Sequence, residues 1–213
     1  LYVINLSQNK VVGEISLKRQ PEKVVAPPTG PLAVVLAQSC LLLVDIQNKT
    51  TFGEVVLKGD SKDAVISPDG GTAYVLTDQD TTGNTTLFVI NLNTQTILKE
   101  LPLGTKYRAL DLNPSAGTLA LIGQQVINNP EAGLLLLLDA GRLMSEPIYN
   151  GETFELAGKK PIDISIDPWR NQALVVFQGD EGALLLQLSN PVPVLSRIVP
   201  EQRVVGDPGF TLT

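Results

Sequence analysis

Apolar residues gather in short runs along this chain, and polar turn residues separate the runs. The runs at 32–36, 134–138 and 173–177 are continuous, without the alternation of a half-exposed strand. Strands of this kind are covered on both faces, so we expect sheets that lie between other layers. The best helical candidate, 140–144, is at most a single turn. The pattern therefore predicts an all-β protein of many short strands.

Two markers recur along the chain in constant order. The first is an apolar strand that closes on Asn, Asp or once Gln, at spacings of 40, 46, 48 and 48 residues: Asn5, Asp45, Asn91, Asp139 and Gln187. The second is a proline turn followed by an apolar strand, at spacings of 40, 46, 54 and 40: Pro28, Pro68, Pro114, Pro168 and a degenerate copy at Pro208. Fixed periods of this length are typical of repeat architectures.

Each repeat unit contains four predicted strands. In the unit around Pro68 they are 62–67, 72–77, 86–92 and 97–103, and its Pro-Asp-Gly-Gly turn predicts a positive φ at Gly70 or Gly71. One such unit cannot bury both of its faces, so successive units have to stack. The sequence therefore predicts a β-propeller of four-stranded antiparallel blades.

The chain holds about five blades' worth of repeats. A closed ring of five would leave 33 residues between Pro208 and Pro28, against 40 to 54 elsewhere. We therefore expect residues 1–213 to form a single propeller domain that is incomplete or trimmed at one or both ends, from a ring of six to eight blades. A closed five-bladed ring is the alternative.

One segment, 65–104, has a more specific pattern. A Pro-Asp-Gly turn leads into a Tyr-Val strand, then into an apolar strand ending in Asn, a Thr-containing turn and a strand ending in Gly, at 67–70, Tyr74-Val75, 89–92, Thr94 and Leu103-Gly104. This order resembles the YVTN-type propeller repeat of bacterial and archaeal surface-layer and periplasmic proteins. The resemblance implies a seven-bladed, exported, non-enzymatic scaffold or binding protein of the periplasm or cell surface, and it supplies no catalytic residue.

The composition of the chain argues against several classes of function. With 16 basic and 22 acidic residues the formal charge is −6, so we expect no binding to nucleic acid. Histidine is absent, which removes the commonest general base and metal ligand, and we expect no cofactor and no metal. The single cysteine, Cys40, excludes a disulfide within the chain and lies in an apolar run, as a buried residue would. No apolar run is long enough for insertion into a membrane.

The first strand of each blade lines the channel of a propeller, so the chemistry of these strands matters most. Five residues before the repeat prolines stand Lys23, Asp63, Ala109, Asp163 and Arg203, and one position earlier stand Glu22, Lys62, Arg108, Ile162 and Gln202. The candidate binding set at the channel mouth is Lys23, Asp63, Arg108, Asp163 and Arg203. The alternative is that these charges lie at a solvated rim and form surface ion pairs across blades.

A second candidate site is the turn that carries Trp169 and Arg170, where the sister repeats have small or acidic residues. An exposed aromatic ring beside a cation is typical of a protein contact site. The alternative is that the ring folds back onto its own blade.

Three functions are open at this point. The first is a non-catalytic propeller that binds a protein or a surface glycan through one rim. The second is a lyase or glycoside hydrolase that uses carboxylates at the channel mouth, with Asp63, Asp111 and Asp163 as candidates. The third is an architectural domain of a larger surface protein.

Overall fold

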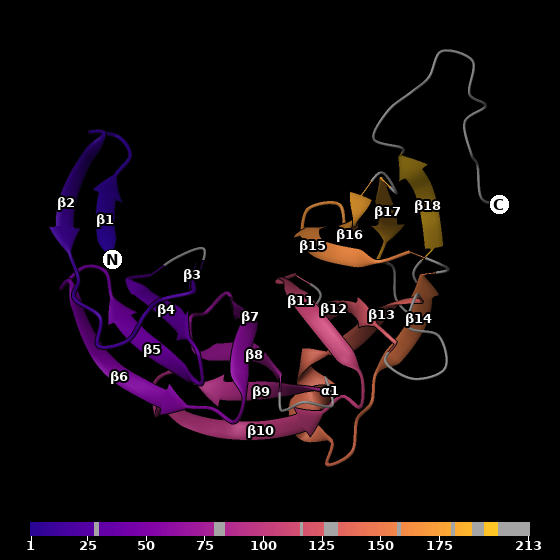
Figure 1. Cartoon of the computed structure of the whole chain (residues 1–213), viewed down its shortest axis with the longest axis horizontal. Coiled ribbons are helices and arrows are strands. Elements are labelled where there is room, and N and C mark those ends of the chain that lie inside the picture. Colours follow the sequence, from indigo (N-terminus) through magenta and orange to yellow (C-terminus); the bar gives the residue numbers. More distant parts are fainter. Residues whose placement is uncertain are drawn as a thin grey trace. The chain divides into compact units, whose positions relative to one another are not determined.

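A computed structural model describes residues 1–27, 30–78, 84–115, 117–125, 132–156, 159–179, 182–188 and 194–199. The chain divides into two compact units, Leu1–Gly104 and Thr105–Thr213, and both are built from antiparallel sheets (Figure 1). The turn around Pro28 and the copy at Pro208, which includes Arg203, lie outside the described residues.

The first unit contains one two-stranded sheet and two four-stranded sheets. Its strands are β1 (Tyr2–Asn5), β2 (Lys10–Glu14), β3 (Lys23–Val25), β4 (Leu32–Ala37), β5 (Cys40–Asp45), β6 (Thr50–Val56), β7 (Asp60–Ile66), β8 (Thr72–Asp78), β9 (Thr85–Asn91) and β10 (Thr96–Pro102). The sheets are β1–β2, β3–β6 and β7–β10, each in sequence order. The four strands predicted around Pro68 are confirmed to within two residues.

The second unit contains two further four-stranded sheets, β11–β14 and β15–β18, again in sequence order. Its elements are β11 (Lys106–Asn113), β12 (Thr118–Gln124), β13 (Gly133–Asp139), α1 (Ala140–Ser145), β14 (Glu152–Leu156), β15 (Pro161–Asp167), β16 (Gln172–Phe177), β17 (Ala183–Gln187) and β18 (Val194–Val199). The expectation of at most one helical turn at 140–144 was too short, because Asp139 accepts from the backbone N–H of Arg142 and caps a six-residue helix.

The Asn and Asp residues of the first marker close the turns after the third strands. In each of four copies the side-chain oxygen accepts from the backbone N–H three residues later, at 2.8 to 3.1 Å: Asn5 from Gln8, Asp45 from Asn48, Asn91 from Thr94 and Asp139 from Arg142. This contact stabilises a tight turn without help from distant residues. The recurrence of the marker is therefore a recurrence of one side-chain contact, which closes a tight turn after Asn5, Asp45 and Asn91 and begins helix α1 after Asp139.

The proline turn around Pro68 has the expected backbone. Gly70 has a φ of 72°, and the Asp69 carboxylate accepts from the N–H of Gly71. Gly71 has no positive φ, so the prediction holds for Gly70 and not for Gly71.

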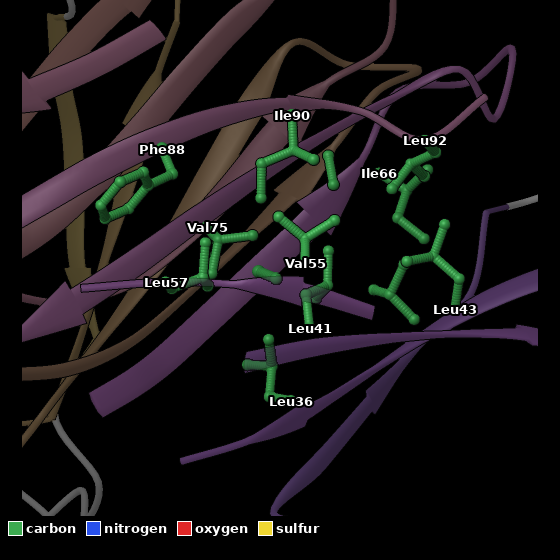
Figure 2. Close-up of a cluster of buried hydrophobic side chains, with 13 residues drawn as sticks. Leu36, Leu41, Leu43, Val55, Leu57, Ile66, Val75, Phe88, Ile90 and Leu92 are labelled. Atoms are coloured by element: carbon green, nitrogen blue, oxygen red, sulfur yellow. The ribbon is translucent and has the colours of Figure 1, made fainter. Parts of the chain in front are cut away.

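Sheet β3–β6 is covered on both faces, as its continuous apolar runs predicted. One face, with Leu36 and Leu41, packs against sheet β7–β10 in a cluster that includes Val75 and Phe88 (Figure 2). The other face, with Val35 and the buried thiol of Cys40, packs against Ile15 beside β1–β2. In the second unit a matching cluster joins sheets β11–β14 and β15–β18, with Ile122 and Phe177 among its members. Within each unit, neighbouring sheets therefore share an apolar core.

Candidate functional site

The residues five positions before the repeat prolines occupy the same place in each sheet. Each first strand pairs with the second strand at that point: Lys23 with Leu36, Asp63 with Leu76, Ala109 with Ile122 and Asp163 with Val176. The four partners also lie at one common offset from their prolines. Residues at the same distance from their prolines therefore occupy the same position in the strand pairing of each sheet. Arg203 lies outside the described residues.

A β-bulge interrupts three of the first strands at this same place, and the sequence pattern had not indicated it. The register shifts lie between Ser61 and Asp63, between Tyr107 and Ala109, and between Pro161 and Asp163. The residue left without a ladder partner is Lys62, Arg108 or Ile162. Bulges re-aim side chains, so these positions do not alternate strictly between the two faces.

The extra residue of two bulges reaches the end of the second strand. Lys62 Nζ lies 3.4 Å from Asp78 Oδ2, and Arg108 Nη2 donates to Gln124 Oε1 at 3.3 Å. These are equivalent cross-strand contacts in two different sheets. The candidate residue Arg108 is therefore held by its own sheet in the second unit.

Lys23 and Asp63 form an ion pair between two sheets of the first unit. Lys23 Nζ lies 2.5 Å from Asp63 Oδ1, which also accepts from the backbone N–H of Ala64 at 2.8 Å. The Lys23 side chain is half exposed, whereas Asp63 is only 4% exposed. The expected pairing across blades is present for Lys23 and Asp63, whereas the expectation of a solvated rim is wrong for Asp63, whose carboxylate is buried.

The two other candidate carboxylates also hold backbone N–H groups. Asp163 Oδ1 accepts from Ile164, and Asp111 Oδ1 accepts from Leu112, at 2.9 and 2.8 Å. Asp111 Oδ2 accepts from the N–H of Ile166 at 2.7 Å, so this side chain links two sheets of the second unit. The geometry gives these carboxylates a role in holding first strands in place.

The turn between β15 and β16 presents Trp169 to solvent. The ring is 95% exposed, so the alternative in which it folds back onto its own blade is wrong. The turn itself is well held, because Asp167 Oδ1 accepts from the N–H groups of Trp169 and Arg170. The Arg170 guanidinium lies 3.4 Å from Asp167 Oδ2. An exposed aromatic side chain is thus carried by a closed, hydrogen-bonded turn.

The connection from β13 to β14 holds a helix longer than the single turn expected at 140–144. Helix α1 replaces the tight turn found after the other third strands, and its Leu143 is buried. Arg142 pairs with Glu146 and lies over the ring of Tyr149, 4.5 Å from its centroid. Ile148 is 82% exposed. The long spacing from Pro114 to Pro168 was the signal of this insertion.

One shallow cavity of about 260 Å³ lies on the first unit beside β5 and β6. It is lined by Lys18, Leu42, Thr51, Phe52, Gly53 and Glu54. The Glu54 carboxylate is already paired with Arg19 at 2.6 Å. Within the described part of the chain, no group of three or more His, Cys, Asp or Glu side chains is placed to hold a metal ion. No described helix is long and apolar enough to cross a membrane.

Comparison with solved structures identifies the fold as a β-propeller. A chain of the Mitotic Checkpoint Complex superimposes with a TM-score of 0.69 at 8% identity, over 93% of this chain and 58% of that chain. The WD40 domain of Toxoplasma gondii coronin superimposes with a TM-score of 0.59 at 12% identity, over 83% of this chain and 44% of that chain. Kuenenia stuttgartiensis hydrazine synthase superimposes with a TM-score of 0.51 at 16% identity, over 87% of this chain and 69% of that chain.

These similarities show the fold alone, because all three identities are low. The chain spans about half the length of the checkpoint and coronin chains that it matches. No protein-family model matches the sequence, and no curated protein matches it either.

Proposed function

We propose that this chain is a non-catalytic β-propeller scaffold that binds a partner protein through the turn carrying Trp169 and Arg170. The observation that supports this most strongly is the 95% exposure of Trp169. Tryptophan and arginine are the residue types most enriched where binding energy concentrates in protein interfaces. Propellers such as the WD40 domain and the checkpoint chain share the fold, and the latter comes from a structure of a complex.

The rigidity of the turn is a second reason to expect a partner to bind there. Asp167 holds the backbone on both sides of the ring through two hydrogen bonds. Less conformational entropy is lost when a partner covers a ring on a preorganised turn than when it covers a ring on a loose loop. The turn therefore fits a docking anchor better than the engaged carboxylates fit a catalytic site.

The proposal is tested first by finding the partner. A photo-crosslinking amino acid at position 169, in cells of the source organism, is expected to trap one protein reproducibly. The matched control places the same amino acid at Tyr2, which is 65% exposed in the first unit. The same set of products from both positions would contradict a specific site at the turn.

The trapped protein is then purified and titrated against wild-type chain and Trp169→Ala. We expect the dissociation constant to rise about tenfold or more, equivalent to about 1.4 kcal/mol. Stability should change by less than about 0.5 kcal/mol, because the ring is fully solvated. Equal affinity of the two chains would refute the turn as the contact. Binding to a glycan array that depends on Trp169, without a protein partner, would instead favour the glycan alternative.

We further propose that the chain belongs to the YVTN-type repeat proteins and is exported to the periplasm or cell surface. The support is the pattern at 67–70, Tyr74-Val75 and Leu103-Gly104. Protease treatment of intact and lysed cells checks the location: an exported chain is cut or released without lysis. Protection until the inner membrane is broken would contradict export.

We also propose that residues 1–213 belong to one propeller domain, because the same four-strand repeat runs through both units. One cooperative calorimetric transition is expected for a single domain, with equal calorimetric and van't Hoff enthalpies. Two separate transitions would contradict it.

A further inference from the structure

Three hydroxyl side chains form a row across sheet β7–β10. Ser61 on β7 is opposite Thr77 on β8, and Thr77 is opposite Thr86 on β9. Residues that pair directly across antiparallel strands lie on the same face of the sheet. That face is the one that packs against sheet β3–β6, since the residues two and four positions before Thr77 on β8, Val75 and Ala73, belong to the core between these two sheets.

Two of these hydroxyl groups are buried and lack a protein partner. Ser61 is 2% exposed and Thr77 is fully buried. Neither Ser61 Oγ nor Thr77 Oγ1 has a hydrogen-bond partner among the residues that the structure describes. A buried hydroxyl left unpaired destabilises the fold, so two at one position are a large cost for a site with no function.

The backbone at this place is already anchored. The N–H of Ser61 donates to the carbonyl of Gln38 at 2.7 Å, and the N–H of Leu57 donates to Ser39 at 2.8 Å. The first bond runs from the start of β7 to the turn between β4 and β5 in the neighbouring sheet, and the second extends the β5–β6 ladder by one residue beside it. The two hydroxyls therefore lie at a fixed seam between the sheets, and the backbone there is already hydrogen-bonded across it.

We propose that this seam is a binding site for one ordered water molecule, held between Ser61 Oγ and Thr77 Oγ1. Directly opposed residues have Cβ atoms about 5 Å apart, and the two hydroxyl oxygens do not hydrogen-bond to each other, so one water molecule between these oxygens can bond to both. Water suits the pair because it donates and accepts, as each hydroxyl does. The water would lie at the edge of the apolar core between the two sheets, beside the row of hydroxyls.

A cation fits this place less well than water does. Both ligands are neutral hydroxyls, which cannot compensate a buried positive charge. The unpartnered carboxylate oxygen of Asp78 belongs to the residue after Thr77, so it lies on the opposite face of the strand. Asp78 therefore does not complete the site.

The test is a double-mutant cycle with Ser61→Ala, Thr77→Val and the double variant, followed by urea unfolding. If the water is bound, each single change leaves it with one anchor, and the unfolding equilibrium constant should rise about tenfold. The double variant should be less destabilised than the sum, because both changes remove the same water. Thr50→Val, on the exposed edge of β6, controls for the change from threonine to valine in a strand.

A change in stability of the opposite sign in Thr77→Val would overturn the proposal. If the two hydroxyls are simply unpaired, Thr77→Val removes an unsatisfied group without changing shape, and it should leave stability unchanged or increase it. A second measurement is independent of stability: magnetisation transfer from water to the Thr77 methyl group in the NMR spectrum should persist in wild type and disappear in Ser61→Ala. Stability that depends specifically on sodium or potassium concentration would show a cation in place of water and would also refute it.

Discussion

At the scale of single residues, side-chain oxygens that accept from nearby backbone N–H groups fix the turns of the repeat. Asn5, Asp45 and Asn91 each close a turn, and the residue in the left-handed region that follows is Asn9, Lys49 or Gln95. These contacts span three residues, so they depend on local sequence more than on distant packing. This explains why the marker is visible in the sequence although the apolar residues around it vary.

Gly70 and Gly71 provide a matched pair for testing the turn chemistry. At Gly70, φ is 72° and an added Cβ would meet nothing closer than 4.0 Å, so only backbone conformation opposes a side chain. We expect Gly70→Val to lower the free energy of unfolding by about 1–2 kcal/mol. Gly71→Val, which has no positive φ, should cost clearly less. Urea denaturation of both variants checks this, and equal losses would contradict the conformational explanation.

Tyr107 predicts a specific loss of stability in alkali. The side chain is 3% exposed, and burial raises the pKa of its phenol to about 12 against an ordinary value of 10. Between these two values the unfolded chain has released the proton and the folded chain has not, so the stabilising contribution is complete below pH 10 and is lost as the pH rises to about 12.

The measurement is the difference in unfolding free energy between wild type and Tyr107→Phe across this range. We expect wild type to lose stability relative to the variant from pH 10 upwards, because phenylalanine has no proton to release. A difference that stays constant with pH would show that the phenol titrates normally in the fold.

At the scale of elements, the bulges of the first strands decide where the charged residues go. The bulge in β11 also presses backbone against β12: a Cβ at Gly123 would lie 2.1 Å from the Lys106 carbonyl oxygen and 2.7 Å from Tyr107 Cα. Only glycine fits opposite this bulge. At Gly53, by contrast, a Cβ would meet only the side chain of Gln95, which can move aside.

We therefore expect Gly123→Ala to destabilise the protein by about 1–3 kcal/mol or more, as over-packing against backbone does. Gly53→Ala should cost well under half as much. Thermal unfolding followed by circular dichroism measures both. A Gly123→Ala variant as stable as Gly53→Ala would contradict the close approach of β11 and β12.

At the scale of the whole molecule, the shared cores of the sheets and the net charge have separate consequences. The cores between sheets belong to pairs of neighbours, which is why the apolar runs are continuous. The net charge of −6 acts at longer range and repels polyanions.

The charge predicts that the chain does not bind duplex DNA. Fluorescence anisotropy of a labelled duplex at about 50 mM salt should stay unchanged up to micromolar protein, because binding of this kind depends on neutralising phosphates. An unlabelled basic peptide, which should raise the anisotropy of the same labelled duplex, is the positive control. Binding to the duplex that weakens steeply with added salt would contradict the prediction.

The candidate sites were predicted less completely than the fold. The alignment on prolines placed Lys23, Asp63, Ala109 and Asp163 at one ladder position, and the structure confirms it. The burial of Asp63 and the bulge beside it were not predicted, because a bulge depends on the fit between two strands. The exposure of Trp169 was one of two open alternatives, since nothing within its own turn decides which way the ring points.

The sequence by itself determined the four-strand repeat, the positions of its turns and the apolar runs that require cover on both faces. These follow from contacts between residues a few positions apart and from the period of the apolar pattern. Only the tertiary structure decided that Lys23 pairs with Asp63, that Asp111 binds the N–H of Ile166, and that Ser61 and Thr77 share a buried seam. The physical reason is that charges and hydroxyls take their environment from whichever neighbouring segment lies against them, and in these cases that segment lies 16 to 55 residues away in the chain.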